Sequence, residues 1–182
     1  MPLIKNGRVV EDRYLRILDD GPIPDEVAVI VPAERFIADA EDILRRAAPT
    51  GVAWPNNRRV AELSPYVDRL ALIALNFPNF KDGRAYSQAR LLRERYGFRG
   101  ELRATGQVLR DQFVFLVRAG FDALDVVKPA DAEAFAATLA RYSVFYQPAG
   151  SGRPPAAVRR LSERPASAIS DEPMVYSNSR SA

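Results

Sequence analysis

The sequence contains no cysteine and no histidine among its 182 residues. The missing thiols exclude disulfide bonds, a thioredoxin-like redox pair and cysteine-ligated zinc or iron–sulfur sites. The missing imidazoles remove the usual acid–base group of enzymes and the commonest transition-metal ligand, so we expect no metal site. Chemistry must therefore come from carboxylate, arginine, lysine, hydroxyl, amide or backbone groups, or from a bound cofactor.

Long apolar runs and a strong net charge are also lacking. Residues 1–8 form no apolar signal segment, and no uncharged run approaches a membrane span, so we expect a cytoplasmic protein that does not enter a membrane. The net charge is only +3, and residues 150–182, with five arginines and three acids, hold +2 of it. The nearly neutral remainder lacks the broad basic face of a nucleic-acid-binding protein. Glycine-rich nucleotide fingerprints and the Gly-x-Ser-x-Gly hydrolase motif are absent too.

The apolar residues that are present predict an α/β fold. Residues 3–17 contain Asn6-Gly7 between apolar pieces, which is a strong signal for a small antiparallel hairpin. Further strands are predicted at 27–31, 52–54, 70–77, 101–105 and 123–127, and helices from 34 to about 48 and at 83–96, 108–119 and 131–143. This alternation predicts a mostly parallel open sheet, or a partial barrel, of about five strands with crossover helices. Five strands are too few for a closed eight-stranded barrel.

The composition changes from residue 149 onward to glycine, serine, proline, arginine and alanine, with few large apolar side chains. Such a segment buries too little surface to offset its ordering entropy. We therefore expect a single domain over residues 1–148 and a disordered tail over 149–182.

Basic side chains gather where the predicted strand 70–77 runs into the next helix. Helix starts at the carboxyl edge of a parallel sheet present free N–H groups to anions, and Lys81 and Arg84 add positive charge there. Alternatively, Asp82 is only an N-cap and the basic groups are solvated.

Two further positions extend this set of candidates. Arg90 shares a helix face with Ser87, although a solvated face explains that pattern as well. Arg103 lies inside a predicted strand, where a buried guanidinium needs a carboxylate, phosphate or oxyanion partner. The candidate anion- or partner-binding residues are Lys81, Asp82, Arg84, Ser87, Arg90 and Arg103.

Asp111 and Gln112 have apolar neighbours at helical spacing, which predicts that both are buried and hydrogen-bonded. We interpret them as a structural network, with Arg103 or Arg84 as the partner of Asp111. The alternative is a substrate-binding carboxylate.

Several segments together resemble the bacterial domain-of-unknown-function family nine hundred thirty-four. The resemblance covers about residues 3–147 and is carried by 77–93, with its Asp-Gly-Arg-x-x-Ser pattern, and by 100–106, 109–112, 120–122, 4–7 and 145–147. Members of this family are usually labelled probable oxidoreductases involved in sulfite reduction.

The resemblance, together with the positive charge at the strand-to-helix edge, leads to the hypothesis of an accessory protein, or a probable oxidoreductase component, of assimilatory sulfite reduction. It would bind sulfite reductase or a sulfur oxyanion through Lys81, Arg84, Arg90 and Arg103. A second hypothesis is an oxidoreductase with a bound flavin or nicotinamide, in which the cofactor performs the redox chemistry. A third is an interaction module without catalysis.

Overall fold

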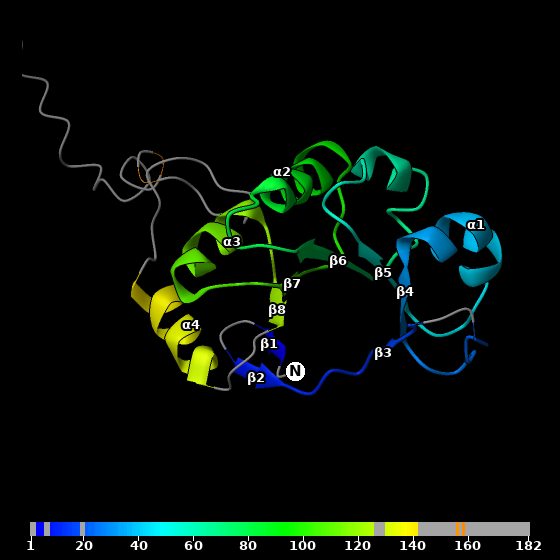
Figure 1. Ribbon diagram of the computed structural model, residues 1–182, viewed down its shortest axis with the longest axis horizontal. Helices are drawn as coiled ribbons and strands as arrows, with labels where there is room; N and C mark the ends of the chain where they lie inside the picture. The colour runs from blue at the N-terminus through cyan, green and yellow to red at the C-terminus, as the bar shows by residue number, and fades with distance from the viewer. Residues whose placement is uncertain are drawn as a thin grey trace, which may run out of the picture.

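The computed structural model describes residues 3–5, 8–18, 21–125 and 130–141, together with Ala156 and Val158. Its strands form one sheet in the order β2-β1-β8-β7-β6-β5-β4-β3 (Figure 1). Strands β3 to β8 are parallel and follow one another in chain order, whereas β1 is antiparallel to both β2 and β8. The predicted α/β class, the N-terminal hairpin and the partial barrel are confirmed.

The strands are β1 (Leu3–Lys5), β2 (Arg8–Val10), β3 (Leu15–Arg16), β4 (Val29–Pro32), β5 (Thr50–Trp54), β6 (Leu72–Phe77), β7 (Glu101–Gly106) and β8 (Ala123–Asp125). The helices are α1 (Ala33–Ile43), α2 (Arg84–Arg90), α3 (Phe113–Ala119) and α4 (Ala130–Arg141), with 3-10 turns η1 (Val60–Leu63) and η3 (Arg110–Gln112) and a π-helical turn η2 (Leu91–Arg95). The five predicted parallel strands are β4 to β8. The sixth, β3, is only two residues long and leaves no periodic signal.

The sheet is curled into a half-barrel because the connection between its two edge strands is too short to span a flat sheet. Eight strands laid flat have seven gaps of about 4.8 Å and would span roughly 34 Å. The two edge strands β2 and β3 are joined by residues 11–14 alone, and the five Cα–Cα steps from Val10 to Leu15 reach at most about 19 Å. Residues 11–14, which we call the strap, therefore cross the concave side of the sheet (Figure 1).

The two faces of the sheet have different cores because side chains alternate along each strand. On the convex face, Ile73, Leu75 and Phe77 of β6 belong to one large core with the helices, which includes Phe36 of α1 and Phe135 of α4. The parallel strands follow one another in chain order, and such strands are joined by right-handed crossovers. The connecting helices therefore all lie on this one face.

The concave face has a much smaller apolar cluster. Ile30, Leu72 and Ala74 pack there against Tyr14 of the strap. Strand β6 is thus covered on both faces, which explains its continuous apolar run from 72 to 75.

Three predicted helices differ from the observed ones. The first, predicted to reach about residue 48, ends at Ile43. The segment 108–119 begins with the 3-10 turn η3, and its α-helix starts only at Phe113, while the segment 83–96 changes from α2 to the π-turn η2 after Arg90. The predicted boundary at 148 and the tail lie outside the described residues, apart from Ala156 and Val158. Across the described part of the chain, every helix is too short or too polar to cross a bilayer.

Candidate anion-binding groove

A hollow of about 380 Å³ lies between the chain that leaves β5 and the helical segment formed by α2 and η2. One wall is the segment 56–61, and the other is a single face of the helical segment, with Arg84, Ser87, Leu91 and Arg95 at helical spacing. Because β5 and β6 are parallel neighbours, the segments that follow them meet at the same carboxyl edge of the sheet. We call this hollow the arginine groove.

The lining of the groove is strongly positive. It consists of Asn56, Asn57, Arg58, Arg59, Val60, Ala61, Arg84, Ser87, Gln88, Leu91, Arg95 and Tyr96. Four of these residues are arginines, and none is an aspartate or a glutamate. Guanidinium groups remain charged at any physiological pH, so the groove attracts anions throughout that range.

Two of the four arginines are already partly neutralised by carboxylates beside the groove. Arg58 donates from Nε to Glu62 Oε2 at 2.8 Å and lies 5.1 Å from the centre of the Trp54 ring. Arg84 donates from Nη2 to Asp82 Oδ2 at 2.6 Å.

The other two arginines, Arg59 and Arg95, have no carboxylate partner within the part of the chain that the structure describes. Both side chains are exposed. Arg95 lies 5.8 Å from the centre of the Tyr96 ring, a contact that leaves its N–H donors open. Each of these two guanidinium groups is therefore free to pair with an oxyanion in the groove.

The buried amide of Gln88 holds the two walls of the groove together. Gln88 Nε2 donates to the carbonyl oxygens of Pro55 at 3.1 Å and of Arg58 at 2.8 Å, which fixes the post-β5 segment against α2. Gln88 Oε1 and Asn56 Nδ2 are enclosed and make no hydrogen bond to the described residues. These contacts preform the wall that carries Arg58 and Arg59.

Asp82 is a partner of Arg84 and not a proton donor. The hydrogen bond from the Arg84 side chain, outweighing partial burial and helped by the Arg84 backbone N–H, holds the pKa of Asp82 well below its usual range. The Asn56 amide faces this carboxylate and contributes to the lowered pKa, although it is outside hydrogen-bond geometry. The same ion pair raises the pKa of Arg84.

The structure brings together only part of the set proposed from the sequence. Arg84 and Ser87 line the groove, and Asp82 lies beside it. Lys81 is exposed over the Phe80 ring, 5.6 Å from its centre, and Arg90 is exposed and pairs with Glu94 at 3.2 Å. Neither Lys81 nor Arg90 is among the residues that line the groove.

Sequence reasoning missed Arg58, Arg59 and Arg95. The signal that was available for the first two is the pair of adjacent arginines shortly after β5, the strand next to β6. Arg95 carried a signal of its own, because it follows Ser87 and Leu91 at steps of four on one face of the predicted helix 83–96.

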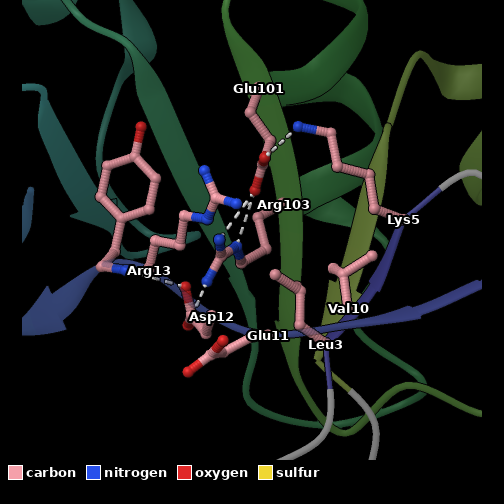
Figure 2. A pocket seen from close by; sticks show the side chains of 9 residues that line it. Leu3, Lys5, Val10, Glu11, Asp12, Arg13, Glu101 and Arg103 are labelled. Carbon is pink, nitrogen blue, oxygen red and sulfur yellow. Dashed lines mark hydrogen bonds and ion pairs between the residues drawn. The ribbon is translucent and has the colours of Figure 1, made fainter.

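Arg103 lies on the opposite, concave face of the sheet, in a cavity of about 320 Å³ closed by the strap (Figure 2). Its side chain is only 1% exposed, and its partners are carboxylates. Nε donates to Glu101 Oε1 at 2.9 Å, and Nη1 donates to Asp12 Oδ2 at 2.6 Å. Asp125 Oδ1 lies 3.9 Å from the same guanidinium.

Two more cations complete this concave network. Lys5 donates to Glu101 Oε2 at 2.7 Å, as Figure 2 shows, and Arg16 pairs closely with Asp125. Three cations thus face three carboxylates, and the network is internally neutral. It holds the strap in place and already supplies Arg103 with carboxylates at Nε, Nη1 and Nη2.

Two carboxylates of the network, Asp12 and Asp125, have opposite pKa shifts. Burial would raise the pKa of Asp12, but hydrogen bonds from Arg103 and the Tyr14 backbone, with the nearby positive charges, lower it overall. Burial raises the pKa of Asp125, against the opposing charges of Arg16 and Arg103.

The prediction that Asp111 and Gln112 are both buried is wrong. Asp111 is exposed and Gln112 half-buried. The helical spacing used for the prediction does not apply, because residues 110–112 form a 3-10 turn before α3 begins. Gln112 instead joins two loops: its Oε1 accepts the Leu109 N–H at 3.0 Å, and its Nε2 donates to the Phe80 carbonyl oxygen at 3.0 Å.

The described residues include no group of three or more carboxylates that could hold a metal ion. The fold and the groove thus define an α/β half-barrel protein, wound in chain order, with an arginine-lined hollow that begins at the carboxyl edge of its sheet and follows the helical segment of α2 and η2. Residues 51–157 match the family model described as "Bacterial protein of unknown function (DUF934)", and the chain belongs to this family. No curated protein matches the chain.

Proposed function

We propose that the protein binds an oxyanion of sulfur in the arginine groove and acts as an accessory component of assimilatory sulfite reduction. The observation that carries this proposal is the lining of the groove, in which four guanidinium groups occur with no carboxylate. A guanidinium pairs with an oxyanion through two parallel hydrogen bonds, so Arg59 and Arg95 suit an anion with several oxygen atoms.

The pathway is supported by the resemblance noted from the sequence, and the accessory role by the chemical inventory of the chain. Reduction of sulfite needs an electron carrier, and the chain has no thiol that could cycle electrons and no thiol or imidazole that could ligate a redox metal. Binding sulfite, or docking onto sulfite reductase, requires only the charged groups that are present.

The first test is binding of inorganic oxyanions to the full-length protein. Sulfite, sulfate and phosphate are titrated by calorimetry into the wild type, Arg59→Ala and Arg99→Ala. Arg59 lines the groove, whereas the exposed Arg99 lies outside it, so each variant loses one positive charge. We expect sulfite to bind and Arg59→Ala to weaken it by about tenfold or more, the value of one charged hydrogen-bonded pair.

Arg99→Ala should leave sulfite affinity within about twofold of wild type, since exposed charges at a distance are screened by salt. Failure of the wild type to bind any of the three oxyanions, or equal weakening by both variants, contradicts the proposed site.

The pathway is tested separately in the bacterium that encodes the protein. We expect deletion of the gene to slow growth on sulfate or sulfite as the sole sulfur source but not on cysteine. Wild type should restore growth and Arg59→Ala should not. Sulfite reductase should also be recovered with the tagged protein from cells starved of cysteine. Normal growth on sulfate would remove the pathway assignment, and a flavin absorption band in the purified protein would favour an oxidoreductase instead.

A further inference from the structure

The arginine groove is much larger than an inorganic oxyanion. A water molecule occupies about 30 Å³ of liquid volume, so sulfite or sulfate occupies roughly 60–90 Å³. The groove has a volume of about 380 Å³. Hollows of about 300 Å³ and more are typical of sites for organic ligands. Most of the space is left over when one oxyanion is bound.

The unfilled part of the groove has an apolar wall. Leu91 lies between Arg84 and Arg95 along the helical segment and is 41% exposed. Tyr96 is the residue after Arg95. It is half-buried, and its ring lies beside the Arg95 guanidinium. Inorganic anions gain nothing from contact with an exposed leucine and a tyrosine ring, whereas a planar organic group gains from both.

The charged residues are distributed along the groove and not gathered at one point. Arg84 and Arg95 are eleven positions apart, which corresponds to roughly 16 Å along a helix. Arg59 lies on the facing wall. An elongated molecule with an anionic group and a ring can contact an arginine and the apolar wall at once.

We propose that the arginine groove takes an organic ester of sulfate or phosphate, with its oxyanion on Arg59 and Arg95 and a planar ring against Leu91 and Tyr96. This inference rests on the proposed oxyanion-binding function and names the class of ligand for the same site. The chain has no glycine-rich phosphate loop, so recognition of the oxyanion falls to arginine side chains.

The test compares esters with their two halves on the full-length protein. Adenosine 5′-monophosphate and 4-nitrophenyl sulfate are titrated beside inorganic phosphate, inorganic sulfate, adenosine and 4-nitrophenol. At least one ester should bind about tenfold or more tighter than its inorganic oxyanion, which is the typical value of stacking one ring on an aromatic side chain. Adenosine and 4-nitrophenol should bind weakly, because they lack the charge.

Two kinds of variant separate the ring from the charge. Tyr96→Leu keeps an apolar side chain but removes the ring, and Leu91→Ser changes an exposed position, so both should fold. Each should weaken the tighter-binding ester by about fivefold to tenfold and leave inorganic phosphate and sulfate unchanged. Arg59→Ala should weaken esters and inorganic oxyanions alike.

The outcomes distinguish this inference from the proposed function. If inorganic sulfite or sulfate binds as tightly as both esters, the ring site is overturned while oxyanion binding stands. If an ester binds but neither Tyr96→Leu nor Leu91→Ser weakens it, the placement of the ring is wrong. If neither these probes nor inorganic sulfite binds, both proposals fail.

Discussion

Arg103 Nη1 donates a 2.6 Å hydrogen bond to Asp12 Oδ2, and this pair joins the strap to the middle of β7. The two residues are 91 positions apart in the chain. Because the strap links the edge strands β2 and β3, the pair also fixes the curl of the sheet. The Tyr14 ring, centred 5.7 Å from the same guanidinium, adds a second contact from the strap.

Replacing Asp12 with asparagine should destabilise the protein. The substitution keeps the shape of the side chain but removes one of the charges that compensate Arg103, which is 1% exposed. Glu101 still pairs with Arg103, so we expect a loss of about 2 kcal/mol in the free energy of unfolding, the value of one hydrogen bond to a charged group. Urea denaturation measures it.

The matched control is Glu11→Gln, which removes the same charge from the neighbouring, exposed strap residue. Its effect should stay within about 0.5 kcal/mol. Equal losses in the two variants would show that net charge, and not the pair with Arg103, determines the effect.

Asp12 and Asp125, two of the three carboxylates beside Arg103, should respond to pH in opposite directions. The pKa of Asp12 is lowered below its ordinary 3.8, so its stabilising contribution is present above 3.8 and disappears as pH falls through the lowered value. The pKa of Asp125 is raised above 3.8, so its contribution is present below 3.8 and disappears as pH rises through the raised value.

These signs predict two difference curves. Relative to wild type, Asp12→Asn should become less stable as pH rises from about 2.5 to 7, and Asp125→Asn should become more stable over the same range. Urea midpoints measured across this range provide the comparison. Parallel curves would mean that the two carboxylates share one environment, contrary to their opposite shifts.

Much of the fold was predictable because the strands carry strong local patterns. The run 72–75 is apolar on both faces, and Asn6-Gly7 marks the hairpin. The need of Arg103 for a buried partner also followed from its strand position. Its actual partner, Asp12, was not predictable, because the strap has no periodic pattern and its position depends on the curl of the whole sheet.

The groove was predictable only in part for a similar reason. Arg84 and Ser87 follow a recognisable strand end, so local sequence indicated them. Arg59 belongs to a loop whose position depends on tertiary contacts, including the hydrogen bonds from Gln88 to Pro55 and Arg58. Asp111 was misplaced because apolar neighbours suggested a regular helix where the chain forms a 3-10 turn.

Two glycines with positive φ should differ sharply in their tolerance of alanine. Gly106, at the end of β7, has φ +89°, and a Cβ there would lie 2.4 Å from the Phe77 carbonyl oxygen. Gly97 has φ +66° and no atom within 4 Å of such a Cβ. Gly97→Ala therefore meets only backbone strain of about 1–2 kcal/mol, whereas Gly106→Ala meets strain and a clash with backbone.

We expect Gly106→Ala to lower the free energy of unfolding by about 3 kcal/mol or more, and Gly97→Ala by about half of that or less. Thermal or urea unfolding of the two variants and the wild type measures both losses. Similar losses would indicate that β6 and β7 separate easily at this edge, where the Gln107 N–H donates to the Phe77 carbonyl oxygen at 2.7 Å.

Tyr86 should ionise at unusually high pH. Its ring contacts Phe77 edge-on with the ring centres 5.1 Å apart, and burial, together with the negative charge of Asp111, raises the pKa of Tyr86 to about 12. In an ultraviolet titration, Tyr86→Phe should therefore remove absorbance change near pH 12 and leave the change near pH 10 intact. Asp111→Asn should lower the pKa of Tyr86 only slightly, because burial is the larger cause. Loss of the change near pH 10 in Tyr86→Phe would place this hydroxyl in water, and the contact between α2 and β6 would then be looser than the ring geometry requires.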